Sequence, residues 1–218
     1  MPIVELIESI VKDIAGRYRI RNTEKLRLLA KFYLTNIAHS ITYSSVSRFT
    51  RLPVKTIERF SEYMAGAYLL FFVKRFSFSI KEQENSPRKV YAADNGMAVA
   101  AGFNTAIGKG ALVENAIATE LARRGMETYY WKNPTTGREV DFVVKEGKRY
   151  RLIQAAESID EPNALDREAG ALRSAMKRLG RGSCSIITNS APRDSTVRQL
   201  RKAGVRIEPI WKFLLSDW

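Results

Sequence analysis

Three side chains in the second part of the chain have the types and the spacing of a metal-dependent hydrolytic site. Glu114 lies on a predicted helix, Asp141 lies mid-strand in an apolar run, and Gln154 lies on the next predicted strand. A tight turn at Gly147 would set Asp141 beside Gln154 on a hairpin. An aspartate inside a strand is costly unless it meets a cation, a metal ion or hydrogen-bond donors. Glu114 and Asp141 are therefore predicted ligands of Mg²⁺ or Mn²⁺, and all three residues are candidate catalytic groups.

The same carboxylates also have structural explanations, which the sequence leaves open. Asp141 would be satisfied by a buried ion pair with Arg138 or Arg151. Glu114 would then be an ordinary surface residue of its helix.

The elements around these residues alternate between helix and strand. Apolar periodicity predicts an α/β domain with a mixed sheet. Its elements are a strand at 89–92, a helix at 111–124, strands at 127–131, 138–145 and 149–156, a helix at 162–179, a strand at 184–188, a helix at 195–203 and a strand at 205–209.

The first part of the chain reads as helices followed by strands. The pattern predicts helices at 3–14, 24–39, 42–49 and 54–67, then one or two strands within 68–79. This order is typical of a winged helix-turn-helix, whose third helix lies in the major groove of DNA. The polar segment 81–87, which ends in Pro87, is the predicted linker because it fits neither a helix nor a strand pattern.

A DNA interface on this winged helix would consist of side chains that neutralise phosphates or bond to base edges. Residues on the third helix and the turn before it would face the groove, and two cations would reach phosphates from the wing. The predicted set is Arg48, Arg51, Lys55, Thr56, Arg59, Lys74 and Arg75. The alternative is a winged helix that packs only against protein.

The charge balance favours a polyanionic partner. The 218 residues include 36 Lys and Arg against 23 Asp and Glu, a formal net charge of +13. Residues 1–89 carry 16 of the basic residues and 8 of the acidic ones, so the first part is the more densely positive. An excess of this size indicates nucleic acid, and DNA is the predicted partner.

Composition also indicates the cellular compartment in which the protein is expected. The single cysteine, Cys184, excludes an internal disulfide and favours a reducing interior. No apolar run reaches the roughly 18 residues that span a bilayer, and the N-terminus lacks a signal-peptide pattern. We expect a cytoplasmic protein without a membrane partner, and an oligomer is compatible with the sequence.

Four segments together resemble the C-terminal region of archaeal AAA+ ATPases. They are Asp13–Asn22, Lys89–Gly96, Leu112–Asn115 and Glu139–Val143. A helical glutamate followed by a strand aspartate also resembles the PD-(D/E)XK nuclease core. In that ATPase family a P-loop domain precedes a winged helix and a nuclease-like domain. The resemblance thus implies a linker helix at 1–22, a winged helix at 23–88 and a nuclease-like domain at 89–218.

The chain departs from both patterns at positions that carry chemistry. Ala156 stands where the nuclease pattern has the lysine that stabilises the transition state, and Gln154 stands where it has a carboxylate. These changes predict a degenerate nuclease site. The segment Gly102–Gly110 is one residue too long for a P-loop and has Gly110 where Ser or Thr must hold Mg²⁺, so no ATP site is predicted.

Three functions remain open at this point. The first is a DNA-binding protein with a winged helix and a nuclease-like domain that does not cleave DNA. Its binding to DNA would require no cofactor. The second is an active Mg²⁺-dependent, structure-specific DNA endonuclease. The third is a regulatory interaction domain for a separate AAA+ ATPase, because the amphipathic segment 3–14 must pack on something.

Overall fold

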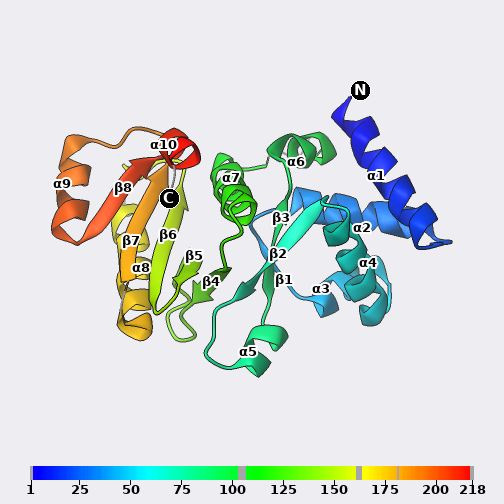
Figure 1. Ribbon diagram of the computed structural model, residues 1–218, viewed down its shortest axis with the longest axis horizontal. Coiled ribbons are helices and arrows are strands. Elements are labelled where there is room, and N and C mark those ends of the chain that lie inside the picture. Colours follow the sequence, from blue (N-terminus) through cyan, green and yellow to red (C-terminus); the bar gives the residue numbers. More distant parts are fainter. Residues whose placement is uncertain (1, 103–106, 161–163, 181, 217–218) are drawn as a thin grey trace. The chain divides into compact units, whose positions relative to one another are not determined.

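The computed structural model describes residues 2–102, 107–160, 164–180 and 182–216 and has a mixed α/β fold (Figure 1). The chain forms two compact units. The first comprises Met1–Val73 and Ser86–Asn115, and the second comprises Lys74–Asn85 and Ala116–Trp218. The domain borders proposed from sequence stay predictions, and residues 103–106 of the rejected P-loop segment lie outside the described residues. Within the described ranges, no helix combines the length and apolarity needed to cross a bilayer.

The first unit contains the four helices expected from the apolar periodicity, although the second ends at Thr35 and not near residue 39. It also contains a strand at Ser40–Ile41 and a helix at Asn95–Ala101 that the sequence pattern did not predict. Its elements are α1 (Ile3–Arg17), α2 (Thr23–Thr35), β1 (Ser40–Ile41), α3 (Tyr43–Thr50), α4 (Val54–Gly66), most of β2 (Leu70–Arg75), β3 (Arg88–Ala92), α6 (Asn95–Ala101) and the start of α7 (Lys109–Arg123). The strands lie in the order β1-β3-β2, and β1 is antiparallel to β3.

Local capping explains where these helices begin and end. The Asn22 side chain accepts a hydrogen bond from Lys25 N (3.1 Å) at the start of α2. Thr42 and Ser45 form a reciprocal capping box at the start of α3. Arg51, with φ 57°, adopts the left-handed conformation that ends α3 and turns the chain into α4.

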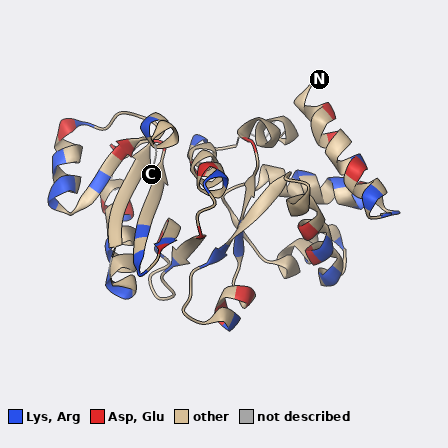
Figure 2. Cartoon of the chain, in the orientation of Figure 1, with Lys and Arg blue, Asp and Glu red and all other residues tan. Residues whose placement is uncertain are grey.

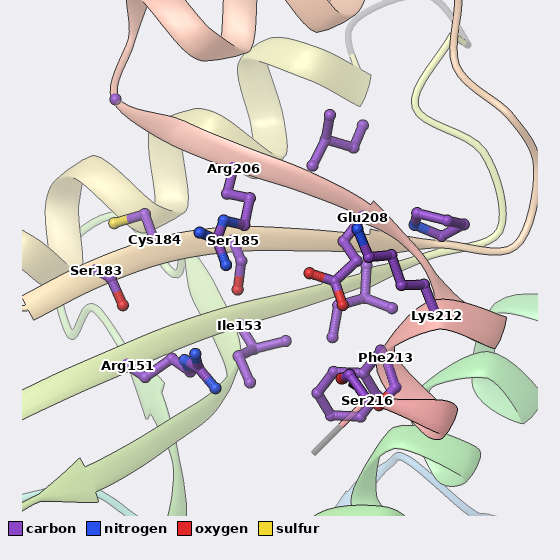
Figure 3. A pocket seen from close by; sticks show the side chains of 14 residues that line it. Arg151, Ile153, Ser183, Cys184, Ser185, Arg206, Glu208, Lys212, Phe213 and Ser216 are labelled. Atoms are coloured by element: carbon purple, nitrogen blue, oxygen red, sulfur yellow. Dashed lines mark hydrogen bonds between the residues drawn. The ribbon is translucent and has the colours of Figure 1, made fainter. Parts of the chain in front are cut away.

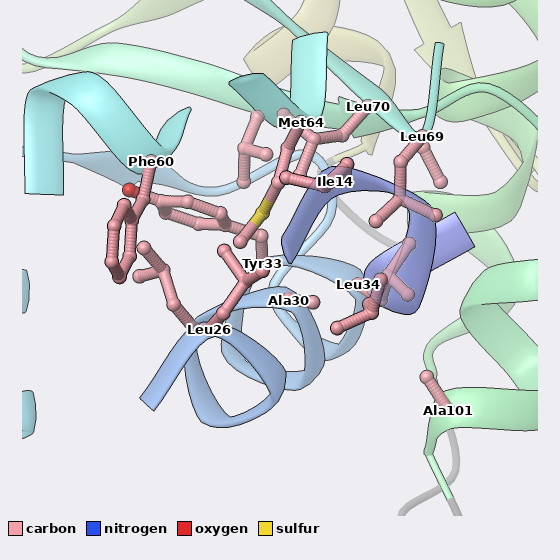
Figure 4. Packing of buried hydrophobic residues seen from close by; sticks show 14 of the residues in the cluster. Ile14, Leu26, Ala30, Tyr33, Leu34, Phe60, Met64, Leu69, Leu70 and Ala101 are labelled. Carbon is pink, nitrogen blue, oxygen red and sulfur yellow. The ribbon is translucent and has the colours of Figure 1, made fainter. Parts of the chain in front are cut away.

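The core of the first unit is built from the buried stripes of α1, α2 and α4. Ile14, Leu26, Tyr33 and Met64 are almost fully inaccessible to solvent, and they pack together in Figure 4. The Tyr33 hydroxyl reaches Ser61 Oγ at 2.7 Å, which satisfies the one polar atom of that ring inside the core. Val11 and Ile14 of α1 thus belong to the core, whereas Ile3, at the start of the same apolar stripe, is 43% exposed, so only the C-terminal part of the stripe is fully covered within the unit.

The second unit is a strand meander followed by parallel strands. Its elements are α5 (Ile80–Asn85), the end of α7, β4 (Thr128–Lys132), β5 (Glu139–Glu146), β6 (Arg149–Ala156), α8 (Ala164–Leu179), β7 (Gly182–Thr188), α9 (Asp194–Lys202), β8 (Val205–Pro209) and α10 (Ile210–Leu215). The pairs β4–β5 and β5–β6 are antiparallel, whereas β6–β7 and β7–β8 are parallel. The end of β2, at Lys74 and Arg75, pairs in parallel with β4.

The predicted linker at 81–87 is wrong in its local structure, because most of it is helix α5. Ser79 begins this short helix: its carbonyl accepts from Gln83 N at 3.0 Å, and its Oγ accepts from Glu82 N at 3.4 Å. An amphipathic stripe is not needed for a helix of six residues that a serine caps. The stretch 68–79 contains the single strand β2 and not a hairpin, since α5 lies between β2 and β3.

Candidate functional site

Glu114 forms part of a buried network within the first unit. Its Oε1 accepts hydrogen bonds from Lys89 Nζ at 2.9 Å and from the Tyr91 hydroxyl at 2.7 Å. The side chains of Lys89 and Glu114 are only 3% and 13% exposed. A buried ammonium needs a carboxylate partner, so this ion pair gives Glu114 a clear structural role.

Asn115, the next residue, locks α7 to β3. Its amide accepts from Ala92 N at 2.8 Å and donates to Ala92 O at 3.1 Å and to Asn95 Oδ1 at 2.8 Å. Asn95 in turn donates to Leu112 O at 3.0 Å. The segments Lys89–Gly96 and Leu112–Asn115, which carry part of the sequence resemblance, therefore bind each other through these contacts.

Asp141 and Gln154 lie side by side in the second unit, as the hairpin predicts. The turn is at Gly147, with φ 61°, and the register pairs Phe142 with Ile153. Asp141 N donates to Gln154 Oε1 at 3.4 Å, and Asp141 Oδ2 accepts from Ala155 N at 3.0 Å. Both side chains belong to residues that are 7% exposed.

Glu168 on α8 joins this pair, and sequence reasoning missed it. The residue is 5% exposed, and burial raises the pKa of its carboxyl, with Asp141 adding to the rise and Arg167 and Gln154 opposing it. Arg167 donates to Glu168 Oε1 at 2.8 Å. Its only sequence signal was a charged residue on the apolar stripe of α8. The site is thus a buried cluster of two carboxylates and an amide.

Glu114 belongs to the first unit, and Asp141 and Gln154 belong to the second. Each residue is accordingly described with the neighbours in its own unit. The proposal that the three residues form one catalytic site stays a prediction. Among the described residues, no group of three or more His, Cys, Asp or Glu has the arrangement of a metal site. Ala156, at the position of the expected lysine, is buried in the apolar cluster of the second unit.

The predicted DNA-contacting cations of α3, α4 and the turn between them are exposed. Arg48, Arg51, Lys55 and Arg59 all lie at the surface, and Thr56 is half-buried. None of these four cations has an ion-pair partner within the part of the chain that the structure describes. Figure 2 shows that α4 also carries acidic residues, so its basic groups lie among some negative charge.

A basic hollow of about 340 Å³ joins the end of α1 to α4 in the first unit. The rings of Tyr18 and Tyr63 stack with their centroids 3.5 Å apart and their planes 5° from parallel. This stack brings the loop after α1 against α4, so Arg19 and Arg21 line the same hollow as Arg59. Arg19 and Arg21 lie in the segment Asp13–Asn22, which carries part of the sequence resemblance, but no pattern in the sequence predicts the stack that places them.

Lys74 and Arg75, the predicted wing contacts, both have acidic neighbours on α5. Lys74 Nζ lies 2.6 Å from Glu84 Oε1, and Arg75 Nη1 lies 3.7 Å from Glu82 Oε1. Arg75 also donates to Lys132 O at 3.0 Å. Their role in DNA contact stays a prediction. In that role each cation would contact a DNA phosphate in addition to its acidic neighbour.

Glu120 anchors the end of α7 in the second unit. Its carboxylate accepts from Arg123 Nε at 2.7 Å and from Arg124 Nε, and Arg124 Nη2 donates to Phe213 O at 2.9 Å. Hydrogen bonding from Arg123, followed by that from Arg124, lowers the pKa of Glu120 from 4.5 to about 2 against the opposing effect of burial. The carboxylate is therefore more stable as an anion in the folded chain.

Replacing Glu120 with glutamine is expected to lower the free energy of unfolding at neutral pH by about 1–3 kcal/mol. A depressed pKa contributes stability above the usual pKa of 4.5, and this contribution is lost as the pH falls from there to about 2. The free energies of unfolding of wild type and variant, measured by urea titration, should thus converge as the pH falls below 4.5. A difference that stays constant with pH would contradict the assigned pKa.

Comparison with known proteins finds that each part of the chain is similar to a family without an assigned function. Residues 5–107 match DUF8612 and residues 109–201 match DUF4143, each described as a domain of unknown function. DUF4143 is often found at the C-terminus of AAA-ATPase-like proteins. This finding agrees with the sequence resemblance to the C-terminal region of AAA+ ATPases.

The similar curated proteins are themselves uncharacterized. The protein MJ1544 of Methanocaldococcus jannaschii is 28% identical over 217 residues, which cover 94% of this chain and 47% of the relative. A protein of Haemophilus influenzae is 26% identical over 167 residues, covering 72% of this chain and 40% of the relative. The chain thus spans less than half the length of these relatives.

Two solved structures show a distant likeness. Can2 from Sulfobacillus thermosulfidooxidans, in complex with cyclic tetra-adenylate, is 10% identical with a TM-score of 0.40, covering 94% of this chain and 53% of that one. Protein VC1899 from Vibrio cholerae is 10% identical with a TM-score of 0.35, covering 98% and 54%.

Proposed function

We propose that the chain is a DNA-binding protein that uses a winged helix in its first unit and carries a nuclease-like second unit without turnover. The element order α2-β1-α3-α4-β2-β3 supports the winged helix, as does the strand order β1-β3-β2. In this fold α4 would be the helix that enters the major groove. The insertion of α5 between β2 and β3 makes the proposed wing unusual.

The observation that carries the proposal is the set of exposed cations around α4. Arg48 and Arg51 precede the helix, Lys55 and Arg59 lie one turn apart on it, and Arg19 shares the hollow beside Arg59. Exposed cations without carboxylate partners repel one another, and a phosphate backbone would relieve this repulsion while releasing counterions. The Tyr18–Tyr63 stack would hold two of the contacting segments together without DNA.

Binding to duplex DNA is expected to weaken steeply with salt, because each phosphate contact adds about 0.9 to the slope of log K against log salt. Fluorescence anisotropy with a labelled duplex of about 20 base pairs at several KCl concentrations measures this slope. The same titration with a branched duplex compares the affinity of the chain for branched and for unbranched DNA. Absence of measurable affinity for either duplex at low salt would refute the proposal.

The second unit is proposed to bind without cleaving, since its carboxylates are covered. Asp141 and Glu168 are 7% and 5% exposed, and Ala156 provides no cation for a transition state. We expect no cleavage of branched or single-stranded DNA in Mg²⁺ or Mn²⁺, and no difference between the chain and its Asp141→Ala variant in a gel assay. Cleavage that Asp141→Ala abolishes would instead establish the endonuclease alternative.

An AAA+ ATPase is the proposed protein partner. The support is the position of DUF4143 at the C-terminus of AAA-ATPase-like proteins and the relatives' greater length. On this proposal, the two units would supply DNA contacts to an ATPase motor that lies outside these 218 residues.

A further inference from the structure

A large open groove lies on one face of the strands β6, β7 and β8 in the second unit. Its volume is about 710 Å³. Leu152, Ile186 and Val205 point into the apolar cluster that includes α8. Because side chains alternate along a strand, the residues between them face the opposite side, where the groove lies. Many of the strand residues that line the groove are polar or charged, whereas Ile153 and Ile187, which also line it, are buried.

One end of the groove carries arginines and serines. The strand register sets Arg151 beside Ser183 and Ser185 beside Arg206. Figure 3 shows these four side chains on adjacent strands. Serine hydroxyls are short, so they leave the space above the strands open and can donate hydrogen bonds to anionic oxygen. Guanidinium groups add bidentate donors of the geometry that phosphate accepts.

The other end of the groove is mixed in character. Figure 3 places Glu208, Lys212, Phe213 and Ser216 there, around α10. The ring of Phe213 is buried and gives an apolar wall, whereas Glu208 offers carboxylate oxygens that accept hydrogen bonds from hydroxyl groups. This end therefore suits a hydroxylated part of an organic molecule.

Positive charge is in excess over the groove as a whole. Arg151, Arg206 and Lys212 line it, against Glu208 among the described lining residues. Arg151 Nε lies 3.8 Å from Glu146 Oε1, while Arg206 and Lys212 have no ion pair within the described part of the chain. Burial lowers the pKa of Arg151, and nearby Arg206 lowers it further against the opposing effects of Glu146 and Glu208. Cations that crowd one another in this way favour an anionic ligand.

We propose that this groove binds a small organic ligand with two or more phosphate groups, such as a nucleoside polyphosphate. The phosphates would lie over Arg151, Arg206 and the serines, and a sugar hydroxyl would bond to Glu208. The volume lies within the range of small-molecule sites and exceeds what a single phosphate fills. The site lies in the second unit, does not use the Gly102–Gly110 segment, and is independent of the proposed winged helix.

Isothermal titration calorimetry with ATP and with inorganic pyrophosphate tests this site on the full chain. We expect both to bind, and Arg206→Gln to raise both dissociation constants about tenfold. Arg206 is exposed and forms no ion pair within the described residues, so this variant should fold. Arg198→Gln, an exposed arginine of α9 outside the groove, is the matched control and should leave both constants unchanged.

One further variant separates the ends of the groove. Glu208→Gln should weaken ATP but not pyrophosphate, because only ATP carries the sugar hydroxyl. Competition with a short oligonucleotide tells whether the phosphates of a nucleic acid end occupy the same groove. Absence of ATP and pyrophosphate binding, or equal losses in Arg206→Gln and Arg198→Gln, would overturn the proposal. Duplex affinity, measured on the same proteins, reports separately on the winged helix.

Discussion

A chain that carries both Lys55→Ala and Arg59→Ala is expected to bind duplex DNA at least tenfold more weakly than wild type at about 0.1 M salt. Both side chains are exposed, and they lie one turn apart on α4, the helix proposed to enter the major groove. Neither has an ion-pair partner within the described ranges, so the substitutions remove positive charge without breaking a salt bridge there. The loss should be smaller at high salt, where fewer counterions are released.

The salt dependence gives a second readout that a general loss of folding would not produce. If both cations contact phosphates, the slope of log K against log salt should fall by about 2. Lys12→Ala, an exposed lysine of α1 in the same unit, serves as the control and should leave affinity and slope unchanged. Equal affinity of the double variant and wild type would place the DNA contact elsewhere on the chain.

The Tyr18–Tyr63 stack explains why the basic loop after α1 could not be assigned from sequence. The stripe of Val11 and Ile14 predicts α1, because apolar periodicity is a local signal. A stacked pair of residues 45 positions apart has no such signal. Arg19 and Arg21 are close together in the sequence, but the surface that they share with Arg59 depends on this tertiary contact.

Glu168 shows the same limit in the second unit. The turn at Gly147 predicted that Asp141 would meet Gln154, since a hairpin fixes its own register. Which residue of α8 faces that pair depends on how the helix packs on the sheet. Lys89 and Tyr91 likewise approach Glu114 only because β3 and α7 pack together in the first unit. Spacing alone could not tell a metal ligand from a member of an ion pair.

Replacing Glu114 with alanine is expected to lower the free energy of unfolding by about 3–5 kcal/mol. The substitution would remove a carboxylate that lies 2.9 Å from the ammonium of Lys89, whose side chain is 3% exposed. It would also remove an acceptor that lies 2.7 Å from the Tyr91 hydroxyl. A urea titration followed by circular dichroism measures the change. Glu62→Ala, an exposed glutamate of α4, is the control and should change stability by less than about 0.5 kcal/mol.

The size of this change distinguishes the two roles proposed for Glu114. A carboxylate held in place to ligate a metal usually costs stability in the metal-free chain, so its removal would leave stability unchanged or improve it. A member of a buried ion pair behaves in the opposite way. Replacing both partners by apolar residues, as Lys89→Met with Glu114→Leu, should then recover much of the loss, because no charge remains buried. A double variant as unstable as Glu114→Ala would show that the two residues do not act as a pair.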